Sequence, residues 1–397
     1  MSDKKIEEEI GQLLTRADGI DDTTREILLR HNGFGLGPKE KLEDIAKDFG
    51  VTKEAVRQRS IKGVERISDR LSYGSPDEEV VTLSKLCTFL AKIAPCTESD
   101  MQNVLYMQEW TDKKDIDIEA LTHMLDELKF DHKLAVVKEG SKDAETRFLV
   151  LDNARHVIRS LIKRAREEVT AHGACNIPYL AKEVATGHTH PSNQLRCLVA
   201  ALESQKDFVW LTDEVNDEFT RQPIGFFLLK DAGRNPVELR LKRIFSVRVK
   251  SNQKWMHKKY VRSRKAMKSD VAIPPEAIAR IGVEKGICKP AAEEGVYERA
   301  MHLDPKKVLS DFEYKIWDFL RKHPGSKDSE IMDACKRRET DRFNIRSKLN
   351  FSVVIQRVSH GIYSAVTDDF PKLADTTVVG VGKSPTKKTE AVKAASA

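Results

Sequence analysis

The sequence has 397 residues, of which 33% are charged and 40% hydrophobic, a composition typical of several charge-rich globular units rather than one core. No run approaches the roughly 18 apolar residues that a membrane-spanning helix needs. The acidic start, MSDKKIEEEI, lacks the basic and then apolar order of a signal peptide. These features argue against membrane and secreted proteins, and we expect a cytoplasmic, nucleoid-associated protein.

The net charge of +6 is distributed unevenly. Between Arg234 and Lys268 there are 13 lysines and arginines against one acid, Glu238, so the rest of the chain is acidic overall. Such a segment favours a surface that faces a polyanion. The six cysteines are scattered without zinc-ligand spacing, which predicts reduced core thiols, no metal site and no cofactor.

In chain order, apolar residues at helical spacing predict helices over 4–16 and 22–31, and the glycine-rich GFGLG at 33–37 ends them. The next stretch, KLEDIAKDFGVTKEAVRQRSIKGVERI at 41–67, has the pattern of a helix-turn-helix. Ala46 stands where two helices approach closely, Gly50 where a turn needs a left-handed backbone, and Thr52 where it can N-cap the second helix.

The start of that second helix carries side chains that match base edges in a major groove. Arginine pairs with guanine, glutamine with adenine, and glutamate accepts from cytosine. We therefore predict base readout by Lys53, Glu54, Arg57 and Gln58. Phosphate contacts are predicted for Thr52, Arg59 and Lys62.

TKEAVRQ, preceded by KLEDIAKDFGV and by REILLRHNGFGL, resembles region four of bacterial primary-type sigma factors, the domain that reads the −35 promoter element. The resemblance spans 22–71 and implies that the four residues named above contact bases or the adjacent backbone. Residues 59–63 depart from the family pattern, and Gly63 inside a helix costs about 0.5–1 kcal/mol, so we expect a frayed or reshaped helix end. Nothing resembles region two, which favours a stand-alone sigma-like protein over a complete sigma factor.

Beyond a linker at YGSPDEE, a helical segment is followed by two β-branched or aromatic runs, three times over. Helices followed by a hairpin are the order of a winged helix. We predict a mainly α fold with small β-hairpins, in which an N-terminal helix-turn-helix precedes tandem winged-helix units. The predicted helices that precede hairpins are 118–130, 193–204 and 343–351. The predicted domains are 1–73, the helix-turn-helix; 79–152, 153–231 and 306–367, winged helices; 232–305, a basic helical segment and connector; and 368–397, a disordered tail.

The segment 234–268 begins with a helical pattern, and 269–305 is broken by proline and glycine, which predicts an irregular connector with one or two short helices. Trp255 and Tyr260 either stack on bases or anchor the segment to a neighbouring unit. The alternative to a DNA-facing segment is a charged, flexible connector. Predicted phosphate contacts here are Arg240, Lys242, Arg243, Lys258, Lys259, Arg262 and Arg264.

Charge separates the predicted winged helices. The helix at 118–130 carries Glu119, Asp126 and Glu127, and the presumed wing at 212–223 is acidic, so phosphates would repel both units. We expect these two units to be structural or to bind protein. The last unit is basic over 336–348, either as a solvated surface or as a source of phosphate contacts from Arg342, Arg346 and Lys348.

No catalytic constellation is present, and His188 with His190 lacks a third metal ligand nearby in the sequence. We therefore expect a protein that is not an enzyme: a bacterial, sequence-specific binder of double-stranded DNA that regulates transcription. The alternative is a scaffold or accessory subunit of a polymerase-associated, defence or mobile-element complex, in which the acidic winged helices bind RNA polymerase or other proteins.

Overall fold

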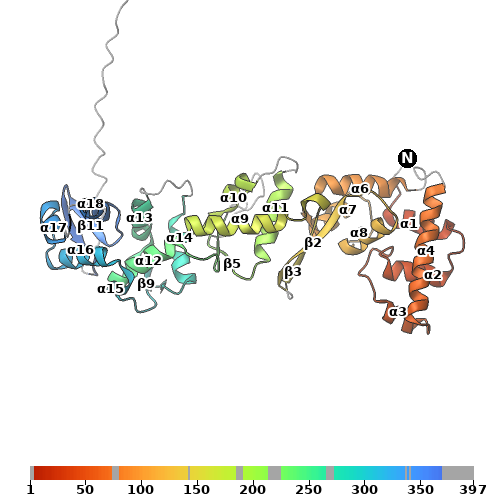
Figure 1. Cartoon of the computed structure of the whole chain (residues 1–397), viewed down its shortest axis with the longest axis horizontal. Coiled ribbons are helices and arrows are strands. Elements are labelled where there is room, and N and C mark those ends of the chain that lie inside the picture. The colour runs from red at the N-terminus through yellow and green to blue at the C-terminus, as the bar shows by residue number, and fades with distance from the viewer. Residues whose placement is uncertain are drawn as a thin grey trace, which may run out of the picture.

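The computed structural model describes residues 4–73, 80–141, 144–184, 191–212, 225–264, 272–335, 338 and 341–368. The predicted tail, apart from Asp368, lies outside these ranges, as do the histidines at 188 and 190 and most of the acidic run at 212–223. The described chain is mainly helical with small antiparallel sheets, as predicted. Its parts form an extended row (Figure 1).

The N-terminal part, residues 4–73, is called the head. It consists of α1 (Ile6–Arg16), α2 (Asp22–His31), α3 (Leu42–Asp48) and α4 (Lys53–Tyr73). Asp21 caps α2, because its carboxylate accepts a hydrogen bond from Thr24 N at 2.7 Å. At one end of the row α3 and the start of α4 project away from the remaining units (Figure 1).

After the head, the described residues repeat one order of elements: helix, short strand, helix, helix and two strands. In each repeat the last strand is central and pairs antiparallel with the other two. We call the repeats units 1 to 4, and the helix before each strand pair the third helix of its unit. Unit 1 contains α6 (Val81–Ile93), β1 (Cys96–Thr97), α7 (Glu98–Met107), α8 (Ile118–Glu127), β2 (Leu134–Ser141) and β3 (Ala144–Leu151). A short 3-10 helix, η1 (Asp152–Ala154), leads to unit 2.

The other units keep this order with shorter strands. Unit 2 contains α9 (Val157–His172), β4 (Cys175–Asn176), α10 (Ile177–Val184), α11 (Pro191–Glu203), β5 (Phe208–Trp210) and β6 (Phe226–Leu229). Unit 3 contains α12 (Pro236–Val247), β7 (Lys250–Asn252), α13 (Gln253–Arg264), α14 (Pro275–Glu284), β8 (Cys288–Pro290) and β9 (Val296–Arg299). After α15 (Pro305–Val308), unit 4 contains α16 (Asp311–Lys322), β10 (Ser326–Lys327), α17 (Asp328–Cys335), α18 (Asp341–Phe351), β11 (Ile355–Ser359) and β12 (Ile362–Ala365).

Unit 3 corrects the prediction of an irregular connector over 269–305. Residues 275–299 form α14, β8 and β9, which complete a three-stranded sheet with β7. Strands of three or four residues are too short to show alternation in the sequence, and Pro290 suggested a break. This proline lies in β8 at the edge of the sheet, where a missing N–H donor is tolerated.

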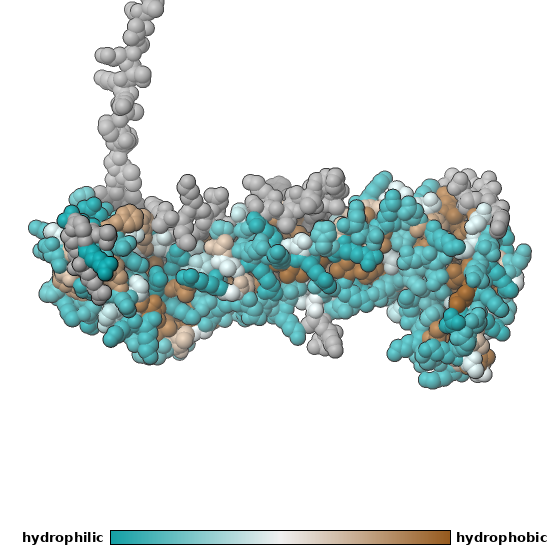
Figure 2. Space-filling model, in the orientation of Figure 1, coloured by the Kyte–Doolittle hydropathy of each residue, from teal (hydrophilic) through white to brown (hydrophobic). Residues whose placement is uncertain are grey.

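The hydrophobic cores cross the boundaries between units. One cluster joins α1, α2 and α4 of the head to unit 1, a second joins the unit 1 sheet to α9 and α11, and the largest joins units 2, 3 and 4. The six cysteines are free and buried, as expected from the sequence. On the face in Figure 2 the surface is largely hydrophilic, and hydrophobic residues show mainly as narrow strips along the row. Shared cores therefore hold neighbouring units in contact.

Candidate nucleic-acid interface

The turn between α3 and α4 has the local structure that the sequence predicts. Gly50 adopts a φ of +64°, and the hydroxyl of Thr52 accepts a hydrogen bond from Ala55 N at 3.2 Å, which caps α4. A small core of Ile27, Ile45, Ala46 and Val56 holds α2, α3 and α4 together. The start of α4 is therefore fixed relative to the rest of the head.

The four predicted base-reading residues share an exposed face at the start of α4. Arg57 Nη2 lies 2.7 Å from Glu54 Oε1, and Gln58 Nε2 donates to the same oxygen at 2.8 Å. Hydrogen bonds from Arg57 and then Gln58 lower the pKa of Glu54 to about 2. Lys53 pairs with Glu43 of α3. Glu54 thus stays ionised and orients two neighbouring donors, so the face carries acceptors and donors in fixed positions.

The predicted phosphate contacts of the head differ in how they are engaged. Lys62 is exposed, Arg59 lies 3.2 Å from Asp21, and Thr52 already accepts the capping hydrogen bond. Two further exposed lysines, Lys39 and Lys41, immediately precede α3, and sequence reasoning missed them. The signal was their position, since the start of the first helix also borders the backbone in helix-turn-helix complexes.

Gly63 corrects the expectation of a frayed helix end, because α4 continues unbroken to Tyr73. A Cβ on Gly63 would lie 2.9 Å from Thr24 Cγ2 and 3.1 Å from Leu28 Cδ1 of α2. The glycine therefore lets α2 and α4 approach closely, and this packing offsets its low helix propensity.

The head covers the third helix of unit 1. Gly33 of the head lies so close to α8 that a Cβ would stand 2.2 Å from Ala120 O, and Asp117 N donates to Leu36 O at 2.8 Å. Only Asp126 of α8 is exposed. On the other side of this contact, the buried carboxylate of Glu9 accepts from the N–H groups of Thr82 and Leu83 at the start of α6. The third helix of unit 1 therefore serves as the docking site of the head.

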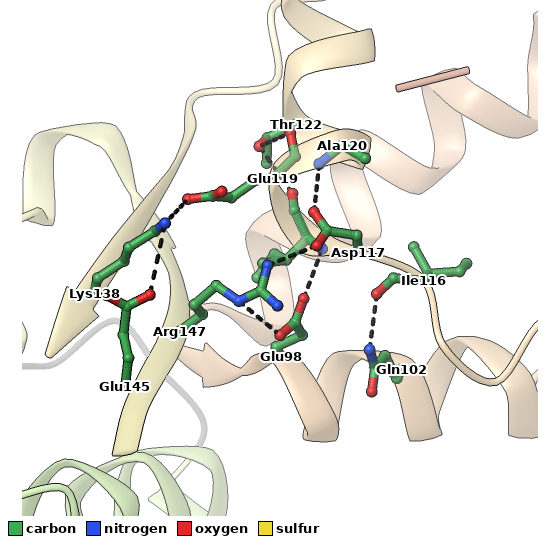
Figure 3. A network of polar contacts seen from close by, with 11 residues as sticks. Glu98, Gln102, Ile116, Asp117, Glu119, Ala120, Thr122, Lys138, Glu145 and Arg147 are labelled. Carbon is green, nitrogen blue, oxygen red and sulfur yellow. Dashed lines mark hydrogen bonds and ion pairs between the residues drawn. The ribbon is translucent and has the colours of Figure 1, made fainter. Parts of the chain in front are cut away.

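A polar network ties α7 and α8 to the sheet of unit 1 (Figure 3). Arg147 on β3 lies 2.7 Å from Asp117 and 3.1 Å from Glu98. Lys138 on β2 lies 2.6 Å from Glu119, the acid that charge arguments single out on this helix. These charges are used inside unit 1, which supports a structural role for them.

The third helices of units 2 and 3 are also packed over most of their surface. Cys197 and Ala201 of α11 are buried against the unit 1 sheet, and Arg196 lies 3.6 Å from Asp100. Among the side chains described on α11, Arg196 and Glu203 are exposed. On α14 the exposed side chains are one acid and one base, Glu276 and Arg280. Neither helix offers a continuous basic face.

The basic segment 234–268 corrects several predicted phosphate contacts. Lys259 is 4% exposed, and its Nζ donates to Ile355 O at 3.0 Å and to Gln356 Oε1 at 2.6 Å. Arg262 donates to Asn350 O at 2.7 Å and to Leu349 O at 3.2 Å. Both cations therefore join α13 to unit 4, and their donors are used by protein oxygens.

Other cations of this segment are engaged as well. Arg240 donates to Ser263 Oγ and Pro236 O, Lys242 lies 2.6 Å from Glu238, and Arg243 lies 3.6 Å from the buried Glu313 of unit 4. Lys258 is exposed, and the side chain of Arg264 lies outside the described atoms. Part of the charge excess of the segment therefore lies at internal junctions, while Arg234, Lys250, Lys254 and Lys258 are exposed; the linear charge count did not separate the two groups.

The aromatic residues of the segment follow the anchoring alternative. Tyr260 is buried, and its hydroxyl donates to His172 O in unit 2 at 3.1 Å. Trp255 lies beneath Arg248 and Lys259, with the Lys259 Nζ 5.2 Å from the ring centroid. Their rings pack within and between units, which leaves no free stacking face on Tyr260.

The third helix of unit 4 differs from the others. Its exposed residues are Arg342, Phe343, Asn344, Arg346 and Asn350. Lys348, a predicted phosphate contact, lies 3.7 Å from Glu313. An open groove of about 610 Å³ runs beside the helix, and its lining includes Arg342, Arg346, Lys327 and His360 together with Asp328 and Asp333.

Comparisons with protein families, with curated proteins and with solved structures found no match to the chain. Within the described ranges, no helix is long and apolar enough to cross a membrane.

Proposed function

We propose that this chain is a sequence-specific binder of double-stranded DNA that regulates transcription, with base readout by the start of α4. The observation that carries the proposal is the exposed face of Lys53, Glu54, Arg57 and Gln58 on a helix whose first turn is capped by Thr52. Such side chains on the N-terminal part of a second helix match the chemistry of major-groove edges. The head is then a helix-turn-helix similar to region four of sigma factors.

The surroundings of α4 support this role. The start of the helix projects from the row of units (Figure 1), so a duplex can approach it. Lys39, Lys41 and Lys62 are exposed around it and are suited to phosphate contact. We further propose that units 1 to 4 are winged helices, because each has the element and strand order of that fold.

Selection of bound duplexes from random DNA tests the proposal, with the double variant Arg57→Ala and Gln58→Ala beside the wild type. We expect the wild type to enrich one motif, and the variant to lose preference at the contacted base pairs by about 1–3 kcal/mol per lost contact. A matched control replaces the exposed Arg155, which pairs with Asp152 as Arg57 does with Glu54, and the exposed Gln108 by alanine, so that the change in charge is the same. A wild type that enriches no motif, or a variant with unchanged preference, would contradict base readout by α4.

A scaffold function is the second candidate. It is favoured by the burial of α8, α11 and α14, because the side chains that the structure describes on these three third helices are mostly packed internally and form no continuous exposed face. Capture of RNA polymerase or of the products of neighbouring genes by the tagged protein, with no shift of any selected DNA by the pure protein at moderate salt, would favour the scaffold.

A further inference from the structure

We propose that unit 4 carries a second duplex-reading face on α18, and that the chain holds two DNA segments at opposite ends of one row of units. The second face is argued without using the proposed function of the head. The joining of two segments rests on the proposed function of the head.

The first argument is exposure. Among the side chains that the structure describes on the four third helices, α8 exposes Asp126, α11 exposes Arg196 and Glu203, and α14 exposes Glu276 and Arg280. In contrast, α18 exposes five residues, three of them consecutive. The side chains described on the other third helices are thus mostly buried, whereas α18 contacts α13 through the carbonyl groups of Leu349 and Asn350 and exposes five of its side chains.

The second argument is chemistry. Arg342 and Arg346 can contact guanine or phosphate, Asn344 can pair with adenine, and Phe343, which is 79% exposed, can contact the thymine methyl group. A solvent-exposed phenylalanine between two arginines gains nothing in the isolated protein. An acid opens the helix at Asp341, but this carboxylate already accepts from Arg338 N at 2.9 Å.

The third argument is the wing. Arg357 of β11 has its Nη2 2.7 Å from Nδ1 of His360, which lies in the turn between β11 and β12, and both residues are exposed. His360 and Lys327 line the groove beside α18. Asp328 and Asp333 lie on the α17 side of that groove, so we assign the phosphate contacts to α18 and the wing. Phosphates match the cations of α18 and the wing, and base edges match Asn344 and Phe343, so this set of side chains favours duplex DNA over an apolar protein surface, which offers no acceptors.

The position of the two faces decides what they do together. The head stands at one end of the row and unit 4 at the other (Figure 1), and cores shared across unit boundaries connect them. A short straight duplex bound by α4 therefore does not reach α18. Simultaneous binding therefore requires two duplexes, or one duplex that is long enough to run from end to end of the row or is bent between the two faces.

A two-duplex capture experiment with the full chain tests this inference. One duplex, whose sequence was selected from random DNA by the wild type, is tethered to beads. A second, labelled duplex is then retained only if the protein joins the two. The variant pair Arg342→Ala and Arg346→Ala removes two cations from α18. The control pair Lys306→Ala and Lys307→Ala removes two exposed lysines from α15. A third variant, Phe343→Ala, removes the exposed ring with little effect on folding.

We expect wild type and the α15 control to retain the labelled duplex. The α18 variants should lose at least 10-fold in retention while still binding the tethered duplex, and the arginine pair should lower the salt slope of nonspecific binding by about 2. Retention by the α18 variants at the wild-type level, or no retention by the wild type, would overturn the inference. If Arg57→Ala with Gln58→Ala leaves sequence preference unchanged but the α18 variants still lose nonspecific binding, the head proposal fails and the α18 face stands.

Discussion

Lys259 provides the sharpest test of how the basic segment is used. Its ammonium group lies at the junction of units 3 and 4, 4% exposed, with no acid among its contacts. Burial, and then the nearby charges of Arg262, Arg248 and Lys258, lower the pKa of Lys259 to about 7. An unfolded lysine titrates near 10.4. The folded and unfolded states therefore bind different numbers of protons above pH 7.

The sign follows from linkage. Below pH 7 both states are protonated, and the folded state carries the full penalty of a buried charge. Between pH 7 and about 10 the unfolded state binds the extra proton, so the free energy of unfolding rises with pH. The slope reaches about 1.4 kcal/mol per pH unit. Across roughly two units from pH 7 to pH 9, Lys259 should therefore contribute a rise of about 2–3 kcal/mol.

Urea unfolding at pH 6, 7, 8 and 9, followed by tryptophan fluorescence, measures this rise. Trp255, one of four tryptophans in the chain, lies next to the site, because its ring centroid is 5.2 Å from the Lys259 Nζ. We compare wild type with Lys259→Met, which keeps the aliphatic stem, and with Lys258→Met, which removes the exposed neighbour. The difference in unfolding free energy between wild type and Lys259→Met should change by about 2–3 kcal/mol over this range. A constant difference, or an equal effect of Lys258→Met, would refute burial of Lys259 at the junction.

Three further predictions concern single positions. Gly33→Ala should destabilise the contact between the head and unit 1 by about 1–3 kcal/mol, because the residue has a φ of +86° and its Cβ would stand 2.2 Å from Ala120 O. Hydrogen exchange of the α8 amides should then become faster, and unchanged exchange would contradict the contact. Glu313→Ala should lower the free energy of unfolding in urea by about 2–3 kcal/mol. The change removes a fully buried acceptor of the Ser352 hydroxyl, and it leaves Arg243 and Lys348, whose side chains are each about one-third exposed, without their acid. A loss below about 0.5 kcal/mol would show that the carboxylate is dispensable. Glu54→Gln should raise nonspecific DNA affinity, because the carboxylate, with its pKa near 2, is anionic at all working pH values and repels phosphates. It should also weaken discrimination between sequences in a competition assay, because the carboxylate orients Arg57. Lower nonspecific affinity would count against this role.

Periodicity in the sequence predicted most helices and the longer hairpins of units 1, 2 and 4. The helix predicted over 118–130 is α8 at Ile118–Glu127, and the one predicted over 343–351 is α18 at Asp341–Phe351. Local chemistry also identified the turn of the head, because a left-handed glycine and an N-cap depend only on nearby residues. The function of these elements in DNA binding stays a prediction.

The sequence alone determined the head's turn, the order of helices and hairpins, and the presence of an unusually basic segment. The tertiary structure decided which charges and helices remain available to a partner. Lys259 and Arg262 donate hydrogen bonds to the carbonyl oxygens of Ile355 and Asn350, which lie 96 and 88 residues away in the chain. The segment at Gly33 covers α8. Burial depends on contacts between segments distant in the sequence, whereas charge counts and periodicity register only neighbours. For that reason Lys259 and Arg262 leave the set of candidate DNA contacts, whereas the exposed cations of α4 and α18, and Lys254 and Lys258 of α13, remain in it.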